Sequence, residues 1–246
     1  MGITKGTTPV GTQSEEQASR WVRQMFGAIA PRYDLLNHLL SFNLDRYWRS
    51  RTIRRISRFP LSSDSRVLDI CCGTGDLTIA LGLSLTAAVY GSDFCHPMLV
   101  AARPKLEARH LRPLLFEADA LHLPIADHSL DVLAVAFGFR NLANYDQGLA
   151  ELRRVMKPGG IVAILEFSIP PNKIFAALYR FYFTHILPFV GGLISGSHEA
   201  YSYLPESVRK FPGAPELANR MLGAGFARVE FEQMTGGIVA VHVGTA

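Results

Sequence analysis

The spacing of hydrophobic positions changes once along the chain, near residue 60. Before that point the spacing is helical, with one stripe made of Trp48, Thr52, Ile56 and Phe59. After it, short apolar runs alternate with helical stretches. We expect strands over residues 66–70, 87–91, 113–116, 130–136 and 161–167, and helices over residues 77–84, 97–109 and 145–156. This alternation predicts βαβ units, and hence an α/β fold with a parallel sheet covered by helices on both faces.

The two ends of the chain depart from this alternation. Residues 228–232 and 238–243 are two further apolar runs around a Gly-Gly pair, which predicts a terminal hairpin. Residues 1–17 are rich in Gly, Thr, Ser and Gln, lack the apolar core of a signal peptide, and are expected to be disordered. We therefore expect a single domain over residues 18–246, with N-terminal helices over residues 18–60.

The most apolar window covers residues 174–194. Arg180, His185, Pro188 and a Gly-Gly pair interrupt it, so it falls short of the roughly 20 uninterrupted apolar residues of a membrane span. We interpret this window as a buried or membrane-touching helix that ends near Pro188. It belongs to a helical insertion over residues 174–210, which we expect to cover a substrate.

Composition narrows the class of protein. Hydrophobic residues make up 48% of the 246, enough for a packed core, and the net charge of +4 is too small to indicate nucleic-acid binding by itself. The three cysteines, Cys71, Cys72 and Cys95, have neither the even count of a disulfide framework nor the spacing of a zinc site. These features predict a protein of the reducing cytoplasm that holds no metal.

A glycine-rich turn follows the first expected strand. Residues 67–76, VLDICCGTGD, predict a buried strand that enters a turn and opens a helix, and Gly73 and Gly75 would let a ligand approach the backbone closely. Thr78 stands where a dinucleotide fingerprint has its third glycine, which weakens that interpretation. A tight turn without a ligand is the simpler alternative. Three carboxyl groups at the same sheet edge, those of Asp69, Asp76 and Asp93, favour a ligand instead.

Polar groups also follow the second and third expected strands. Asp93 lies 18 residues after Gly75, where a carboxylate can accept two hydrogen bonds from a ribose diol, and Phe94 can pack on an adenine ring. Asp119 can accept from an adenine amino group while the Ala120 N–H donates to a ring nitrogen. Asp93 as a helix cap and Asp119 as a turn former are the alternatives. Together these groups predict a site for a nucleotide-like cofactor.

Arg140 and Asn141 come directly after the fourth expected strand. Ligands of open α/β sheets bind outside the carboxyl ends of the strands, so both side chains are expected at the crevice. A surface salt bridge is the alternative for Arg140. Its position after an apolar strand favours a ligand role.

Three stretches carry a family resemblance: YDLLN at 33–37 with Ser41 and Trp48, FGFRN at 137–141, and RVMKPGG at 154–160 with LEFS at 165–168. With the acids and the glycine turn, they make the chain resemble the ubiquinone/menaquinone biosynthesis C-methyltransferase family from about Arg23 onward. The resemblance implies a class I methyltransferase, with a Rossmann-like, mostly parallel seven-stranded sheet and an N-terminal helical extension. It also implies S-adenosylmethionine as the cofactor.

The resemblance assigns the cofactor site to the sheet edge. Tyr33 would close over the cofactor from the N-terminal helices, and the glycine turn would lie beside its methionine part. Asp45 departs from the family pattern, which often has His there, and a Ser is common where Ala136 stands, leaving a backbone contact. The implied cofactor-binding residues are Tyr33, Asp69, Gly73, Thr74, Gly75, Asp93, Phe94, Asp119, Ala120 and Ala136.

The implied reaction is methyl transfer to a ring carbon of a prenylated hydroquinone, from demethylmenaquinol to menaquinol. The Cys71-Cys72 pair and the aromatic run 179–183 resemble menaquinone-specific members of the family. A ubiquinone-pathway quinol (2-polyprenyl-6-methoxybenzoquinol), another small aromatic compound or a lipid remains an alternative substrate. A binding module without catalysis, an RNA methyltransferase and a dehydrogenase are less favoured.

A ring carbon is a weak nucleophile until a base removes the neighbouring hydroxyl proton. We expect a catalytic group of Asp76, Arg140 and Asn141, in which Asp76 takes this proton directly or through a bound water and Arg140 stabilises the resulting oxyanion. An equal alternative for Asp76 is a charge that favours the helix dipole. His185 and Tyr201 are rival bases.

A prenylated substrate would bring the enzyme to a membrane surface. Residues 174–194 would line the tail or touch the inner face of the cytoplasmic membrane, and the arginines at 51, 54, 55 and 58 would bind anionic headgroups. The alternative is a core helix with a solvated charged face. No nucleic-acid partner is expected, and a homodimer is left open.

Overall fold

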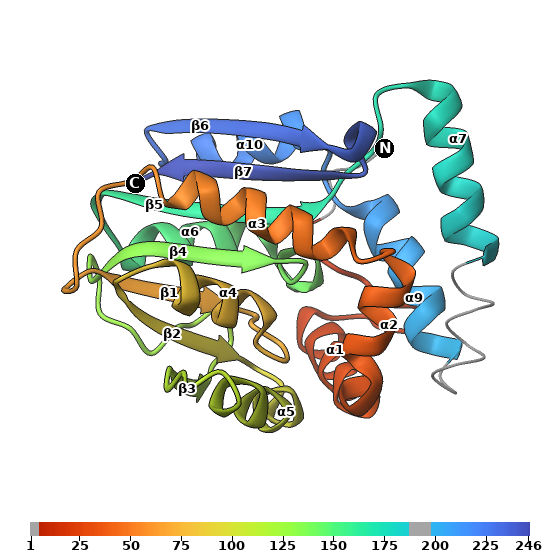
Figure 1. Cartoon of the computed structure of the whole chain (residues 1–246). Coiled ribbons are helices and arrows are strands. Elements are labelled where there is room, and N and C mark those ends of the chain that lie inside the picture. The colour runs from red at the N-terminus through yellow and green to blue at the C-terminus, as the bar shows by residue number, and fades with distance from the viewer. Residues whose placement is uncertain (1–4, 187–197) are drawn as a thin grey trace.

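The computed structural model describes residues 5–186 and 198–246. Its seven strands form one sheet in the order β3-β2-β1-β4-β5-β7-β6 (Figure 1). The first five are parallel, and β7 pairs antiparallel with both β5 and β6, so the predicted mostly parallel sheet and terminal hairpin are confirmed. The strands are β1 Arg66–Ile70, β2 Ala88–Asp93, β3 Leu114–Glu117, β4 Leu130–Ala136, β5 Met156–Phe167, β6 Arg228–Met234 and β7 Val239–Thr245.

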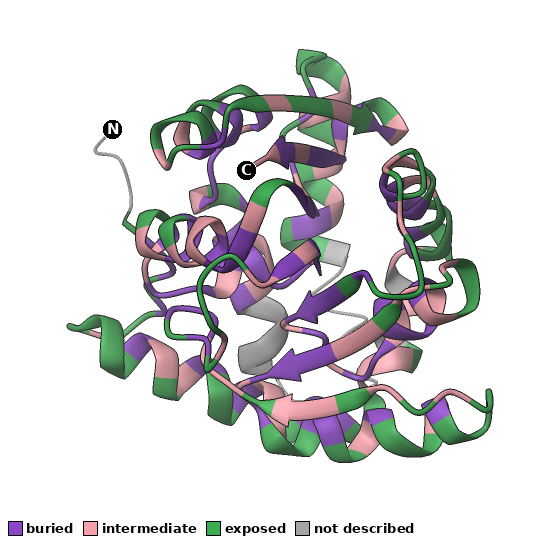
Figure 2. Cartoon of the chain, turned by 90° about the vertical axis from the view of Figure 1, so that its left-hand side faces the viewer, coloured by how far each residue is buried: buried purple, intermediate pink, exposed green. Residues whose placement is uncertain are grey.

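Helices cover both faces of the sheet. Adjacent residues of one strand face opposite sides, and both sides are apolar: Val132 packs with α3 and α4, whereas Leu133 packs with α6 and α10. Figure 1 shows α3 and α4 in front of the sheet and α6 and α10 behind it. Figure 2 shows the central strands mostly buried. These helices are α3 Leu44–Ile56, α4 Asp76–Ser84, α5 His96–Glu107, α6 Tyr145–Val155 and α10 Ala214–Gly223.

The N-terminal extension lies at the carboxyl end of the strands. It comprises α1 Glu15–Ile29 and α2 Tyr33–Leu40, followed by α3 (Figure 1). Ser14 caps α1 by accepting from the Gln17 N–H. Thr7, in the segment expected to be disordered, is buried and donates its N–H to the Leu142 carbonyl at 2.8 Å. From Lys5 onward this segment therefore differs from the disorder that its composition predicts.

The insertion after β5 is helical where the structure describes it. α7 Lys173–Phe181 leads into a π-helical turn, Tyr182–Ile186, and α9 His198–Lys210 follows. The expected helix end near Pro188 lies outside the described residues. Within the described ranges no helix is both long and apolar enough to cross a bilayer.

Candidate active site

The turn after β1 has an unusual backbone. Cys71, Gly73 and Gly75 all have positive φ, at 50°, 55° and 83°. A Cβ on Gly75 would lie 3.2 Å from the Ala102 Cβ of α5, so a side chain there would push the two helices apart. The turn thus brings the backbone N–H groups before α4 to the carboxyl edge of the sheet.

Asp93 ends β2 beside this turn. Its Oδ2 accepts the Gly73 N–H and its Oδ1 accepts the Cys95 N–H, each at 2.8 Å. Burial raises the pKa of Asp93 to about 6, although the two backbone donors oppose the shift. A buried acceptor-rich carboxylate at this edge suits a ligand with adjacent hydroxyl groups.

Most of the predicted cofactor residues line one small cavity of about 50 Å³ at the carboxyl ends of β1, β2 and β4. Phe94 supplies an aromatic wall, and Asp119 Oδ1 accepts the Leu121 N–H at 2.9 Å, which fixes its carboxylate. The predicted residues that line this cavity are Tyr33, Gly73, Asp93, Phe94, Asp119, Ala120 and Ala136.

Three predicted cofactor residues, Asp69, Thr74 and Gly75, are not among the residues that line it. Asp69 is buried behind the turn, where its Oδ2 accepts from Thr78 Oγ1 at 2.6 Å and burial raises its pKa to about 7. Its Oδ1 has no hydrogen-bond partner in the described part of the chain. The Thr74 hydroxyl donates to Asp34 Oδ1 at 2.5 Å, so it is engaged with α2.

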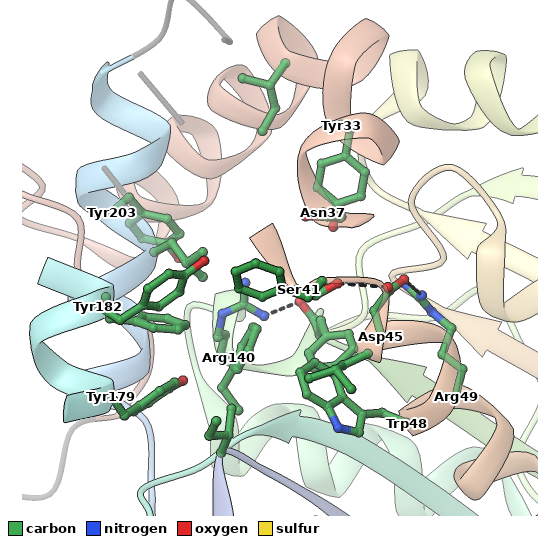
Figure 3. A pocket seen from close by; sticks show the side chains of 18 of the residues that line it. Tyr33, Asn37, Ser41, Asp45, Trp48, Arg49, Arg140, Tyr179, Tyr182 and Tyr203 are labelled. Carbon is green, nitrogen blue, oxygen red and sulfur yellow. Dashed lines mark hydrogen bonds and ion pairs between the residues drawn. The ribbon is translucent and has the colours of Figure 1, made fainter. Parts of the chain in front are cut away.

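A larger cavity of about 340 Å³ adjoins the first (Figure 3). The two cavities share Phe26, Tyr33 and Phe137 as a common wall. Aromatic side chains from α7, the π-helical turn and β5 line much of the remainder, so the space is mainly apolar. The polar side chains in its wall include Asn37, Ser41, Asp45, Arg49 and Arg140.

Arg140 enters the larger cavity from the turn after β4. The side chain is buried, lies 3.2 Å from Glu166 Oε2, donates to the Phe137 carbonyl, and stacks 5.3 Å from the Phe167 ring centre. Burial acts to lower the pKa of Arg140, but Glu166 outweighs it and keeps this pKa above its ordinary value. A fixed, permanently charged donor therefore faces an apolar space.

Asn141 lies next to the common wall and lines the smaller cavity. Its Oδ1 accepts from the Tyr203 hydroxyl at 2.9 Å, and Tyr203 also bonds to Thr7 Oγ1 at 2.8 Å. Tyr203 of α9, which the sequence analysis did not single out, thereby ties the insertion and the N-terminal segment to the site.

Asp76 is not brought together with Arg140 and Asn141. It lines neither of these cavities and instead bonds to Lys105 Nζ at 2.7 Å, at the start of α4. The rival base His185 is exposed, with Nδ1 3.3 Å from the Phe181 carbonyl oxygen. The side chain of Tyr201 lies outside the described residues.

The structure adds a polar group that the sequence analysis missed. Asp45 of α3 is buried, lines the larger cavity, and accepts from Ser41 Oγ at 2.8 Å. His38 Nδ1 lies 2.9 Å from Asp45 Oδ2, and Arg49 forms an ion pair with the same oxygen. The departure from the family pattern at Asp45 was the one signal that pointed here.

A glycine turn, an acid at the end of β2 and a second cavity sharing a wall with the first fit the site expected of a class I S-adenosylmethionine-dependent methyltransferase. Solved structures agree on the fold. A methyltransferase of this kind from Aquifex aeolicus matches with a TM-score of 0.57 over 79% of this chain and 88% of that one, at 19% identity. A second methyltransferase structure, from Thermotoga maritima, matches with a TM-score of 0.63 over 90% of this chain and 98% of that one, at 17% identity.

The chain belongs to the ubiE/COQ5 methyltransferase family, whose model matches residues 12–246. A demethylmenaquinone methyltransferase of Thermus thermophilus is 50% identical over 89% of this chain and 99% of its own length. A ubiquinone/menaquinone biosynthesis C-methyltransferase UbiE of Syntrophotalea carbinolica is 44% identical over 90% of this chain and 92% of its own length. The expected family, fold and S-adenosylmethionine chemistry are confirmed.

Proposed function

We propose that this enzyme methylates a ring carbon of a prenylated hydroquinone, converting demethylmenaquinol to menaquinol. The observation that carries the proposal is the common wall of Phe26, Tyr33 and Phe137 between a small polar-edged cavity and a larger aromatic one. Two reactants held in adjoining cavities that share lining residues would lie next to each other, and such positioning lowers a bimolecular barrier.

The lining of the smaller cavity suits parts of the cofactor, and the space of about 50 Å³ would have to widen to hold the whole molecule. Asp93 offers carboxylate oxygens for a ribose diol, Phe94 offers a ring face for the adenine, and the glycine turn leaves room beside Gly73. S-adenosylmethionine, when bound, supplies a methyl group on a sulfonium, an electrophile that needs no further activation. Asp69 supports the turn from behind through Thr78.

The larger cavity suits the quinol. Its aromatic lining would hold the ring and the first part of the tail, and Arg140 would stabilise the oxyanion left when the ring hydroxyl loses its proton. Asn141, anchored by Tyr203, would hold the wall next to the reacting carbon. Asp76 neighbours His38, which in turn contacts Asp45 in the cavity wall, so any part of Asp76 in proton transfer would be indirect.

The prenyl tail also suggests contact with a membrane. Phe42 and Leu178 line the larger cavity yet are 73% and 63% exposed, and Ile174 on the same helix as Leu178 is 77% exposed. A tail leaving the cavity would pass between apolar side chains that bilayer lipid could cover. Arg51 and Arg55 are bonded to Glu232, so only Arg54 and Arg58 of the expected basic face stay exposed.

The test is a methylation assay with labelled S-adenosylmethionine and two reduced acceptors, demethylmenaquinol and 2-polyprenyl-6-methoxybenzoquinol. We expect faster transfer to demethylmenaquinol. Equal rates on both would replace the proposal with dual specificity, the alternative that the UbiE relatives suggest. Transfer to neither acceptor would refute it.

A further inference from the structure

A line of polar side chains connects the larger cavity with a separate groove between α2, α3, α4 and α5. Ser41 and Asp45 line the cavity, whereas His38 and Asp76 line the groove. The groove is wide and open, with a volume of about 810 Å³. The cavity therefore has a polar connection to a groove that is open to water.

The atoms along this line are close together. His38 Nδ1 lies 2.9 Å from Asp45 Oδ2, and His38 Nε2 lies 3.7 Å from Asp76 Oδ2. The Asp45 side chain is only 4% exposed, whereas His38 and Asp76 are 23% and 21% exposed. The imidazole thus lies at hydrogen-bond distance from a carboxylate sealed inside the protein and 3.7 Å from one that water reaches, a gap that a water molecule would bridge during proton transfer.

Charged side chains surround the imidazole. Arg49 contacts both Asp45 and Asp76, and Lys105 Nζ lies 2.7 Å from Asp76. Arg46, Arg54 and Arg109 line the same groove. The charged groups that surround His38 are Asp34 on α2, Asp45 and Arg49 on α3, Asp76 on α4 and Lys105 on α5.

We propose that Asp45, His38 and Asp76 form a relay that carries the proton released by methyl transfer from the cavity to the groove. The inference rests on the proposed function. In that reaction the hydroxyl O–H bond breaks, and a carbon–carbon bond forms as the carbon–sulfur bond breaks. The methylated ring carbon then loses its proton while the oxygen regains one. One proton per turnover must therefore leave an apolar space.

Asp45 receives this proton because it is the carboxylate that the described part of the chain places in the cavity wall. Burial acts to raise the pKa of Asp45, but Arg49, Ser41 and His38 outweigh it and hold this pKa below its ordinary value. The proton therefore does not stay on Asp45. It passes to the imidazole, whose two ring nitrogens allow it to accept a proton on one side and release one on the other.

A metal site is the competing use of the same side chains. His38, Asp45 and Asp76 each offer a ligand atom, all within 4.8 Å of one another. Arg49 already bridges the two carboxylates with a positive charge, which a metal cation would have to oppose. Activity that survives EDTA supports the relay, and activity that EDTA abolishes and a divalent metal restores overturns it.

The test compares His38→Asn with His110→Asn, an identical change at an exposed histidine in the turn after α5. We expect His38→Asn to lower kcat by about 10²-fold, the lower end of what proton-transfer groups supply, with a changed pH profile and a larger solvent isotope effect. His110→Asn should leave kcat and its pH profile unchanged. The KM for the quinol should stay within about twofold in both variants.

A second variant separates proton transfer from packing. His38→Ala leaves space that free imidazole can enter from the groove, and added imidazole should restore kcat with a rate that follows its basic form. A kcat that is unchanged in His38→Asn, or lost in His38→Ala without rescue, overturns the relay. The ratio of variant kcat to wild-type kcat is measured on whichever phenolic substrate the wild-type enzyme methylates. A failure of the relay can therefore be told apart from an incorrect quinol assignment.

Discussion

At the scale of single residues, the pair Arg140–Glu166 shapes the reaction cavity. Both side chains are buried, and Glu166 also accepts the Arg140 backbone N–H at 3.0 Å. Arg140→Met would leave the Glu166 charge without its partner, so we expect the free energy of unfolding to fall by about 3–5 kcal/mol. Urea denaturation measures this loss, and methyl transfer should be lost with it.

Arg140→Lys is the matched control, because it keeps the charge but loses the planar fork. We expect a smaller loss of stability than in Arg140→Met, but a comparable loss of kcat. Equal stability of the two variants would contradict the view that charge pairing at Glu166 governs the fold here.

Asp69 should make stability fall as pH rises. Burial raises its folded-state pKa to about 7, against about 3.9 for an unfolded aspartate. Between these values the folded state holds a proton that the unfolded state has lost, so the contribution is present below pH 4 and disappears as pH rises to 7. Asp69→Asn removes this dependence, since the amide never ionises.

We therefore expect Asp69→Asn to gain stability relative to wild type as pH increases from 4 to 7. Each unit of raised pKa corresponds to about 1.4 kcal/mol, so the gain is at most a few kcal/mol. Urea unfolding at several pH values measures it, with exposed Asp64→Asn as the control. A gain that does not vary with pH would show that Asp69 is ionised in the folded state.

The candidate site was predictable from sequence where strand order determined it. Asp93 and Asp119 follow neighbouring parallel strands, and the carboxyl ends of such strands meet at one edge, so both line the same cavity. His38 and Asp45 were not predictable in this way. They are joined across a turn in which Asn43 has a φ of 59°, and this break removes the helical periodicity that would have paired them.

At the scale of elements, hydrophobic periodicity gave β4 its observed bounds, Leu130–Ala136, but placed the start of β5 at residue 161 instead of Met156. The lysine, proline and two glycines after Met156 are typical of a turn, yet Met156 pairs with Leu130 across a register shift. Such bulges depend on the partner strand, so a single segment does not reveal them.

Glu232 of β6 joins the edge of the sheet to α3. Its carboxylate accepts from Arg51 at 2.6 Å and from Arg55 at 2.9 and 2.7 Å. The Glu232 carboxylate and both arginines are partly exposed, so we expect Glu232→Gln to lower the free energy of unfolding by only about 1 kcal/mol. Urea denaturation measures this change.

Glu230→Gln is the control for this contact, because Glu230 lies at 4.0 Å from Arg55, is half exposed, and has its closer ion pair with the exposed Arg228 of the same strand. We expect Glu230→Gln to lower the free energy of unfolding by less than half as much as Glu232→Gln does. High salt should reduce the loss in Glu232→Gln, since screening weakens exposed pairs. A larger loss in Glu230→Gln would contradict the assigned contacts.

At the scale of the whole molecule, the apolar mouth of the larger cavity should bind a bilayer. Phe42 and Leu178 are exposed at this mouth, and burying such side chains in lipid contributes roughly 1.5–3 kcal/mol each. The double variant Phe42→Ser, Leu178→Ser should therefore bind phosphatidylglycerol-containing vesicles at least tenfold more weakly in co-sedimentation, because 1.4 kcal/mol is a factor of ten. Its S-adenosylmethionine affinity should be unchanged.

The matched control changes two apolar residues that are exposed elsewhere, Leu114 on β3 and Leu222 on α10. Serine at both positions should leave vesicle binding unaltered, since neither residue borders the cavity. Equal binding of both double variants would locate the membrane contact away from the cavity mouth, and the prenyl tail would then need another way out.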